Sequence, residues 1–335
     1  MIRTALLSRW HVHANDYAKQ TQEHPNMEIA VVWDEDEARG RKWAEELGVP
    51  FEASLEAVLT DDSIDAVIVE TPTNMHKEVI LAAANYGKHI FTEKVLAFTT
   101  KDCDEIFEAV KTNGVHLMVS LPRLTESYFL YARDALDKGL LGELTFIRCR
   151  LAHNGAVPSE QHPNGWLPSH FFNEEQCGGG SLIDLGAHPI YLLNRLAGEA
   201  QAVTARLTQV KNDQVDDNAV VLLDYASGAL GTIETGFVSA RSPFQLELYG
   251  TEGALLVEDG KITLKSSRLQ GEEIVSGDAL PVALPSPHTQ WAAAIAEGAE
   301  PSITKEDVRN LTRVNEAAAL SARENRTVRL QELAV

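Results

Sequence analysis

A glycine-rich segment in the middle of the chain carries two residues whose spacing suits proton transfer. It reads GGGSLIDLGAH at 178–188 and places Asp184 four positions before His188. On a helix this spacing puts both side chains on one face. An imidazole titrates near neutral pH and a carboxylate can hold the ring, so the pair is a candidate acid–base group. A solvated pair on a helix surface would show the same spacing.

A second short segment, Glu93-Lys94-Val95, directly follows the strand-like run KHIFT. Parallel sheets bind ligands beyond the carboxyl ends of their strands, and Lys94 stands at such an end. Its amine could stabilise negative charge that develops on a substrate oxygen. The alternative is an ordinary surface lysine.

The first third of the chain alternates short apolar runs with amphipathic segments of helical period. This alternation predicts a parallel β-sheet that is covered by helices on both faces. The apolar runs are ALLS, IAVVWD, AVIVE, KHIFT and VHLMVS, and the helices between them are expected from residue 15 and over 37–47, 76–86 and 101–113.

The pattern changes at about residue 121, where extended runs separated by turns such as Asp259-Gly260 predict hairpins of an antiparallel sheet. Helices are expected over 126–138, 184–196, 290–296 and 305–324. A chain of 335 residues is too long for one ordinary core, so two domains are expected. The predicted fold class is α/β, with a parallel-sheet domain at 1–121 and an α+β domain with a large, mostly antiparallel sheet at 122–335.

Polar residues at the strand ends of the first domain are candidates for cofactor binding. Asp34 ends the second predicted strand, where an acid in a dinucleotide-binding fold bonds the ribose hydroxyls and favours NAD over NADP. Arg39 and Arg41 lie within reach of this strand end and leave NADP open. Asp34 could instead cap the helix that follows. A polar turn after the third strand could also face a cofactor, and it consists of Thr71, Pro72, Thr73 and Asn74.

The chain is acidic, with 29 Lys and Arg against 49 Asp and Glu and a net charge of -20. It has no basic patch suited to phosphate, so nucleic acid is not an expected partner. No stretch approaches the roughly 18 apolar residues that cross a membrane, and no secretory pattern is present, so a soluble cytoplasmic protein is expected without a membrane partner. Three isolated cysteines and the absence of H-x-x-x-H or clustered His and carboxylate spacing predict neither disulfides nor a metal site.

Three segments in combination resemble the Gfo/Idh/MocA family of pyridine-nucleotide-dependent oxidoreductases. TPTNMH at 71–76 resembles the family's TPN-x-x-H, and GKHIFTEKVLA at 87–97 resembles GKHV-x-x-EKPLA, with Val95 at the usual proline. CGGGSLIDLGAHPI resembles GGG-x-L-x-D-x-G-x-H. The resemblance implies a Rossmann domain, then an antiparallel-sheet domain that binds substrate and forms a homodimer or homotetramer. It also implies that Lys94, Asp184 and His188 are the catalytic set, and that His76 and Glu93 lie at the cofactor.

One segment departs from the family pattern. The phosphate-binding G-x-G-x-x-G should follow the first strand, but the first glycine of the chain is Gly40. Glycine permits the tight turn and the close approach of the pyrophosphate, so Trp10 at the second glycine position is the largest change. Either the loop takes another path and still binds the cofactor, or nucleotide binding is weak or absent. The loop residues expected at the cofactor are Ser8, Arg9, Trp10, His11 and Val12.

Residues of the second domain are candidates for substrate binding, because polar and aromatic side chains suit the hydroxyls and the apolar face of a sugar ring. They are Arg123, His153, Trp166 and His170, together with Lys94, Asp184 and His188. Arg123 could instead pair with a surface acid, and each of the others could be structural.

The expected function is NAD-linked, or NADP-linked, hydride transfer at a secondary hydroxyl or ketone of a sugar, polyol or inositol-like compound. His188 would act as the acid–base group, with Lys94 and Asp184 in support. One alternative is a glycoside-modifying enzyme that uses bound NAD transiently. Another is a non-catalytic protein that binds a sugar or nucleotide, which the missing glycines would favour.

Overall fold

The computed structural model describes residues 1–269, 272–275 and 279–333. It divides into two compact units, which are described separately. The first consists of Met1–Pro122 and Pro285–Lys305, and the second of Arg123–Leu284 and Glu306–Val335. The sequence-based division had placed 285–305 in the second domain. Helix α9 (Pro287–Glu297) instead lies against strands of the first unit, and the functional names given to the two domains stay predictions.

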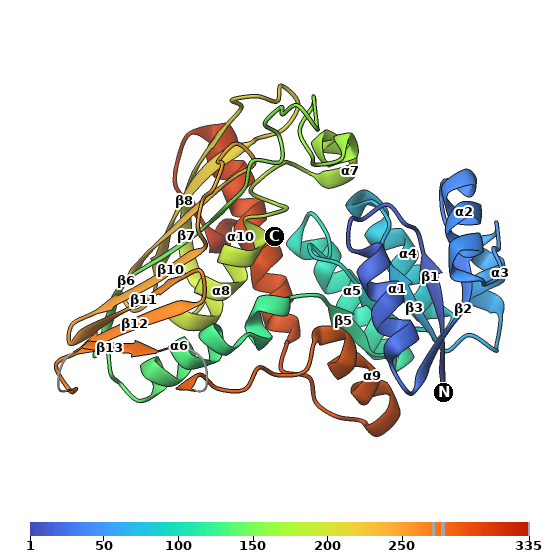
Figure 1. The fold of residues 1–335 in the computed structure, drawn as a ribbon, viewed down its shortest axis with the longest axis horizontal. Coiled ribbons are helices and arrows are strands. Elements are labelled where there is room, and N and C mark those ends of the chain that lie inside the picture. Colours follow the sequence, from blue (N-terminus) through green and yellow to red (C-terminus); the bar gives the residue numbers. More distant parts are fainter. Residues whose placement is uncertain (270–271, 276–278, 334–335) are drawn as a thin grey trace. The chain divides into compact units, whose positions relative to one another are not determined.

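The first unit is built on a five-stranded parallel sheet, as predicted (Figure 1). The order is β2-β1-β3-β4-β5, so the connection from β2 to β3 crosses over β1. The strands are β1 (Ile2–Leu7), β2 (Met27–Trp33), β3 (Ala66–Val69), β4 (His89–Thr92) and β5 (Leu117–Val119). All four residues of β3 are fully buried, because a central strand of such a sheet is covered on both faces.

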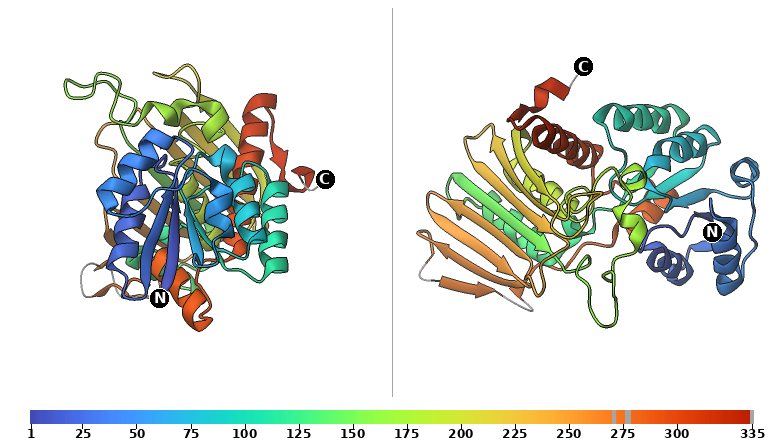
Figure 2. Two further views of the ribbon diagram at one scale, coloured as in Figure 1. Left: turned by 90° about the vertical axis from the view of Figure 1, so that its right-hand side faces the viewer. Right: turned by 90° about the horizontal axis from the view of Figure 1, so that it is seen from above.

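The helices of the first unit begin and end at residues suited to helix termini. Asp36 and Thr99 cap α2 and α5 with side-chain oxygens, and Gly48 and Gly114 end these helices in the left-handed conformation. The helices are α1 (Ala14–Glu23), α2 (Glu37–Leu47), α3 (Leu55–Thr60), α4 (Thr73–Asn85), α5 (Thr100–Asn113) and α9. Figure 2 shows several of them beside the sheet.

The second unit is built on a nine-stranded sheet in the order β13-β12-β11-β10-β6-β9-β8-β7-β14 (Figure 2). Only the pairing of β6 with β9 is parallel, so the prediction of a large, mostly antiparallel sheet is confirmed. The strands are β6 (Leu144–Ala152), β7 (Ala200–Thr208), β8 (Asn218–Tyr225), β9 (Leu230–Gly236), β10 (Gln245–Gly250), β11 (Gly253–Glu258), β12 (Lys261–Ser266), β13 (Glu272–Val275) and β14 (Val328–Arg329).

One face of this sheet is covered by its own unit and the other is open. Burial alternates along β8, where Val221 and Leu223 are buried while Val220 and Leu222 are exposed. Helix α8 packs on β6 and β9. The helices of the unit are α6 (Ser127–Asp137), α7 (Glu174–Cys177), α8 (Ala187–Ala197) and α10 (Lys305–Glu324).

The helix predicted over 184–196 begins later than expected. It starts at Ala187, and Asp184 lies in the hydrogen-bonded turn before it. Asp184 and His188 are therefore not both on α8, because the chain turns through Gly180 to Gly186 before the regular helix begins.

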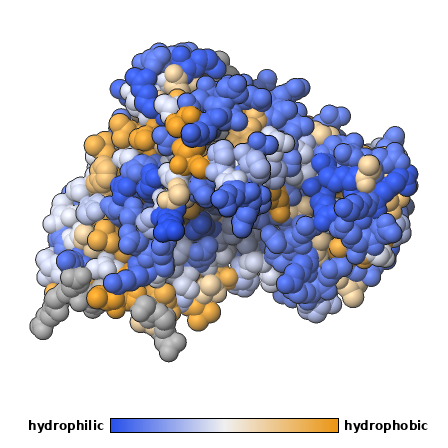
Figure 3. Space-filling view, turned by 45° about the horizontal axis from the view of Figure 1, so that its top comes forward, coloured by the Kyte–Doolittle hydropathy of each residue, from blue (hydrophilic) through white to orange (hydrophobic). Residues whose placement is uncertain are grey.

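Within the described part of the chain, no helix is both long and apolar enough to cross a membrane. Figure 3 shows one face of the molecule, on which hydrophilic residues predominate, in keeping with the high charge.

Candidate active site

The glycine-free loop between β1 and α1 still makes a tight turn. Ser8 has a φ of 78°, the left-handed conformation that glycine adopts most easily. Its hydroxyl oxygen accepts a hydrogen bond from the Trp10 backbone N–H at 3.1 Å, which stabilises the turn. Trp10 itself is only 5% exposed. Ser8 thus supplies the conformation that the first glycine of the family pattern would supply.

Asp34 is buried at the end of β2, and both of its carboxylate oxygens are occupied. They accept hydrogen bonds from the backbone N–H groups of Arg9 and Asp36, each at 2.8 Å. The Arg39 guanidinium donates from Nε at 2.9 Å and from Nη2 at 2.6 Å. Asp36 caps α2, so the alternative that Asp34 caps this helix is wrong. The ion pair with Arg39 neutralises the acid expected to distinguish NAD from NADP.

The polar turn after β3 presents unpaired groups that fit a cofactor. The Thr71 hydroxyl is buried and has no hydrogen-bond partner in the described part of the chain. Helix α4 begins at Thr73 behind Pro72, and no side chain caps its first turn. A helix N-terminus with uncapped N–H groups attracts an anion such as a pyrophosphate.

His76 joins this turn to the segment that carries Lys94. Its Nδ1 lies 3.0 Å from the Val95 carbonyl oxygen, and its Nε2 lies 3.2 Å from that of Thr71. Burial lowers the pKa of His76 to about 4, so the ring is neutral. The contacts of the ring in this unit are structural, and its expected contact with the cofactor stays a prediction.

Lys94 lies at the end of β4 and is 7% exposed, so it is not a surface lysine. The peptide bond between Lys94 and Val95 is cis. The Lys94 backbone N–H donates to Glu93 Oε2 at 3.0 Å. The Tyr17 hydroxyl bonds the other Glu93 oxygen and lies 2.7 Å from Ser120 Oγ. Tyr17 and Ser120 were not predicted, because no short motif links them to the residues after β4.

In the second unit, the glycine-rich segment is held by an aspartate that the sequence analysis did not identify. Asp216 accepts hydrogen bonds from the backbone N–H groups of Gly180 and Leu182, each at 2.9 Å, and from the Ser181 hydroxyl at 2.8 Å. A Cβ on Gly180 would lie 1.9 Å from the Asp216 carbonyl oxygen, so only glycine fits. These contacts fix the turn that carries Asp184.

His188 lies on the first turn of α8 and is half-buried. Its Nδ1 is 2.8 Å from the Tyr191 hydroxyl oxygen, which also accepts the Arg123 backbone N–H at 3.2 Å. Burial holds the pKa of Tyr191 well above its ordinary value, so the phenol keeps its proton. A phenol can donate to or accept from a ring nitrogen, and the bond is therefore compatible with either tautomer of His188.

Apart from Lys94, which belongs to the first unit, the predicted substrate residues lie in the second unit. The Arg123 guanidinium stacks over the Phe244 ring at 4.8 Å and donates to the Tyr128 hydroxyl at 3.4 Å. These contacts with Phe244 and Tyr128, rather than a pairing with a surface acid, position the Arg123 side chain.

His153 stacks on Phe237 with a 5.0 Å ring separation and lies 4.7 Å from the Trp166 ring. Burial lowers the pKa of His153, and the Asp184 carboxylate opposes this shift. Trp166 is 46% exposed, whereas the His170 ring lies against Phe171 at 5.1 Å. The neighbouring rings of His153 and Trp166 form an aromatic group suited to the apolar face of a sugar.

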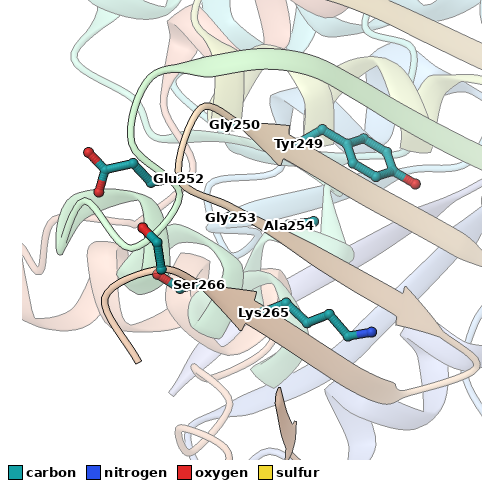
Figure 4. A pocket seen from close by; sticks show the side chains of 8 residues that line it. Tyr249, Gly250, Glu252, Gly253, Ala254, Lys265 and Ser266 are labelled. Carbon is teal, nitrogen blue, oxygen red and sulfur yellow. The ribbon is translucent and has the colours of Figure 1, made fainter. Parts of the chain in front are cut away.

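An open pocket lies elsewhere in the second unit, at the β10–β11 turn and β12 (Figure 4). It is lined by Tyr249, Glu252, Lys265 and Ser266 among others. None of the predicted site residues lines it.

Comparison with known proteins assigns the family. Residues 11–121 match an oxidoreductase family with an NAD-binding Rossmann fold, and residues 129–256 match the GFO/IDH/MocA C-terminal domain. The chain belongs to the GFO/IDH/MocA family of oxidoreductases, and its first unit carries the family's NAD-binding Rossmann fold. The predicted family, fold class and cofactor class are confirmed.

Several characterised proteins resemble the chain over most of its length. A 1,5-anhydro-D-fructose reductase from Ensifer adhaerens is 28% identical, over 80% of this chain and 81% of that protein. An NAD(+)-dependent scyllo-inositol 2-dehydrogenase from Bacillus subtilis (strain 168) is 29% identical, over 70% of this chain and 67% of that protein. A structure of levoglucosan dehydrogenase in complex with NADH and levoglucosan has the same fold, with a TM-score of 0.83, 22% identity, and coverage of 98% of this chain and 99% of that chain.

Proposed function

We propose that the protein transfers a hydride between a nicotinamide and a secondary hydroxyl or ketone of a sugar, polyol or inositol-like compound. The observation that carries the proposal is the hydrogen bond between His188 Nδ1 and the Tyr191 hydroxyl. It orients an imidazole in a chain that belongs to a family of NAD-binding oxidoreductases. The named relatives act on an anhydro sugar and an inositol, which supports this substrate class.

In this proposal His188 takes the hydroxyl proton on Nε2. Two electrons and the proton of the carbinol C–H bond leave as hydride, the hydroxyl oxygen becomes the carbonyl oxygen, and its proton goes to the ring. When bound, the nicotinamide accepts that hydride. Because Nε2 takes the proton, Nδ1 carries a hydrogen both before and after the transfer, and the Tyr191 hydroxyl oxygen accepts from it in both states, so the orientation of His188 is retained.

Lys94 and Asp184 support this transfer. The Lys94 ammonium stabilises the negative charge that develops on the substrate oxygen. The Asp184 carboxylate bonds another hydroxyl of the substrate, while the rings of His153 and Trp166 face its apolar side. Lys94 belongs to the first unit, whereas Asp184 and His188 belong to the second. The joint action of these three residues is therefore part of the proposal.

The first unit's own residues fit the cofactor despite the missing glycines. Ser8 keeps the tight turn, the Thr71 hydroxyl has no partner in the described residues, and the N-terminus of α4 lacks a side-chain cap. These groups would hold the pyrophosphate and adjacent ribose. The remaining predicted loop contacts, from Arg9 to Val12, belong to this proposal.

The experiment incubates the protein with NAD+ or with NADP+ and a panel of sugars, polyols and inositols. The formation of the reduced nicotinamide is measured for each compound. With the best substrate, His188→Ala and Lys94→Ala should each lower kcat/KM by about 100-fold or more. His162→Ala is the control, because this exposed histidine lies outside the proposed site. Full turnover by both site variants would overturn the assignment. Product formed without net reduced cofactor would instead identify the alternative that uses bound NAD transiently.

We further propose that the protein works in the cytoplasm as a homo-oligomer that pairs through the open face of the nine-stranded sheet. This face exposes Val220, Leu222 and Leu230, and such a cluster on a sheet favours association. An ion-pair network on β6, β9 and β10 borders it, in which Arg148 bonds Glu234 and Glu247, each at 2.6 Å.

A further inference from the structure

Three potential metal ligands converge at the loop between β1 and α1. His11 and His13 come from the loop, and Glu93 comes from the end of β4. One ligand atom of each residue lies within 4.8 Å of those of the other two. His11 and Glu93 are 8% and 3% exposed, while the His13 side chain is 50% exposed. An ion would therefore have a buried side and an open side.

In each histidine, Nδ1 lies near a carboxylate oxygen. His13 Nδ1 lies 3.0 Å from an Asp16 oxygen, and His11 Nδ1 lies 3.7 Å from Glu70 Oε2. Metal-bound histidines characteristically present one ring nitrogen to the metal and the other to a carboxylate, carbonyl or water. With Nδ1 of both rings directed at carboxylates, Nε2 is the nitrogen assigned to the metal. The contact of His11 Nδ1 with the His13 backbone N–H, at 3.2 Å, would be given up.

Glu70 is an independent sign that a cation belongs here. It is 1% exposed, and neither carboxylate oxygen has a hydrogen-bond partner in the described part of the chain. Two buried carboxylates in one place are costly unless cations compensate them. A divalent ion beside His11 would add to the charge of Lys94 and lower this cost.

We propose that His11, His13 and Glu93 bind a divalent transition metal of the zinc and cobalt class, with Asp16 and Glu70 orienting the two rings. Two imidazoles and one carboxylate are a ligand set that zinc uses when it keeps an open position. Glu93 already bonds Tyr17 and the Lys94 N–H, but a carboxylate has about four acceptor positions and can also ligate. The sequence alone does not bring these three residues together, because Glu93 is distant in sequence from the two histidines.

The test is a titration of chelator-treated, cofactor-free protein with Co2+, followed by its visible absorption, and then displacement by Zn2+. The expected result is one equivalent of metal per chain, with the absorption intensity of a low-coordinate site. His13→Ala should lower the affinity by more than the roughly 10- to 100-fold typical of losing an outer partner, and Asp16→Asn should lower it within that range. His13 and Asp16 are exposed, so both variants should fold.

His116→Ala is the matched control. The His89 and His116 rings are 5.2 Å apart, the same separation as for His11 and His13, but among the described residues no third ligand completes a metal group there. The control should bind metal as the wild type does. The proposal would be overturned if the wild type did not bind one metal ion per chain. It would also be overturned if His13→Ala and His116→Ala lowered the metal affinity equally. No nucleotide or substrate enters the titration, so the result is independent of the proposed hydride transfer.

Discussion

At the scale of single residues, the proposed site depends on groups that hold its side chains in place. Tyr191 bonds His188, and Arg39 occupies the carboxylate of Asp34. The types and spacing of Lys94, Asp184 and His188 were visible in the sequence. Tyr191, the partner of His188, was not, because it occurs in an ordinary helical pattern and gains its role only from the direction of its side chain.

Tyr191→Phe should lower kcat by about 10-fold, less than the roughly 100-fold or more expected for His188→Ala. The ring keeps its place on α8 but loses the hydroxyl that holds Nδ1. The measurement is the pH profile of kcat, which should change in Tyr191→Phe because the protonation of His188 is no longer coupled to the phenol. Tyr249→Phe, whose hydroxyl bonds Glu247, is the control. An unchanged profile in Tyr191→Phe would show that Tyr191 only packs.

Arg39→Ala should shift the cofactor preference toward NAD. Without the guanidinium, the Asp34 carboxylate keeps its backbone donors but faces a 2′-phosphate as an uncompensated negative charge. Calorimetric titration should show the ratio of the NADPH to the NADH dissociation constant rising by about 10-fold, equivalent to roughly 1.4 kcal/mol. Arg41→Ala removes an exposed arginine that pairs with Glu37, and it should leave the ratio unchanged. A ratio that falls in Arg39→Ala would contradict this account.

At the scale of elements, close backbone contacts position the turn that carries Asp184. The parallel strands and most helices could be predicted, because apolar runs and helical periods report burial directly. The start of α8 could not, since the hold of Asp216 on the turn joins segments far apart in sequence. The placement of α9 with the first unit was missed for a similar reason: its period shows a buried face but not what covers it.

Gly180→Ala should destabilise the second unit by about 1–3 kcal/mol or more, because the added Cβ overlaps the Asp216 carbonyl oxygen. Gly228→Ala is the comparison. Its Cβ would meet nothing within 4 Å, so only the positive φ opposes it, at a cost of about 1 kcal/mol. Urea unfolding measures both. Equal stability of Gly180→Ala and the wild type would show that the turn is not held as described.

His288 on α9 should make the first unit less stable in acid. It lies among Thr21, Phe91, Trp291 and His24, with its Nε2 3.0 Å from Thr21 Oγ1. Burial, and His24, lower its pKa from 6.5 to about 4. The unfolded chain therefore binds the proton first, and stability is lost as the pH falls from about 6.5 toward 4, by at most roughly 3 kcal/mol.

The measurement is urea unfolding at several pH values in this window. His288→Gln should reduce the dependence of the unfolding free energy on pH, whereas His162→Gln, at an exposed position, should not. An identical dependence in His288→Gln and the wild type would mean that other groups cause the acid loss.

At the scale of the whole molecule, the sequence predicted the two kinds of sheet, the family and the cofactor class. Those features rest on repeated patterns and on motifs that act together, and the family comparison confirms them. The loop from Ser8 to His13 could not be interpreted in advance, because a turn without glycine has many paths. The structure shows that Ser8 adopts the left-handed conformation. It also shows that one potential ligand atom from each of His11, His13 and Glu93 lies within 4.8 Å of the other two.

Leu222→Glu should weaken association of the proposed oligomer. The charge would lie in the exposed apolar cluster on the open sheet face, where burial against a second copy would be costly. Light scattering after size exclusion should show a lower mass than for the wild type. Val210→Glu, at an exposed position beyond the end of β7, should keep the wild-type mass. A monomeric wild type would contradict the proposal directly.

Direct hydride transfer is the central claim, and isotope transfer tests it. The best substrate from the screen is labelled with deuterium at the reacting carbinol carbon, and the reduced nicotinamide is analysed by mass spectrometry. The account predicts one deuterium on the reduced cofactor from the wild type, and a rate of labelling about 100-fold or more lower with His188→Ala. Reduced cofactor that carries no deuterium, or labelling at the wild-type rate in His188→Ala, would contradict it.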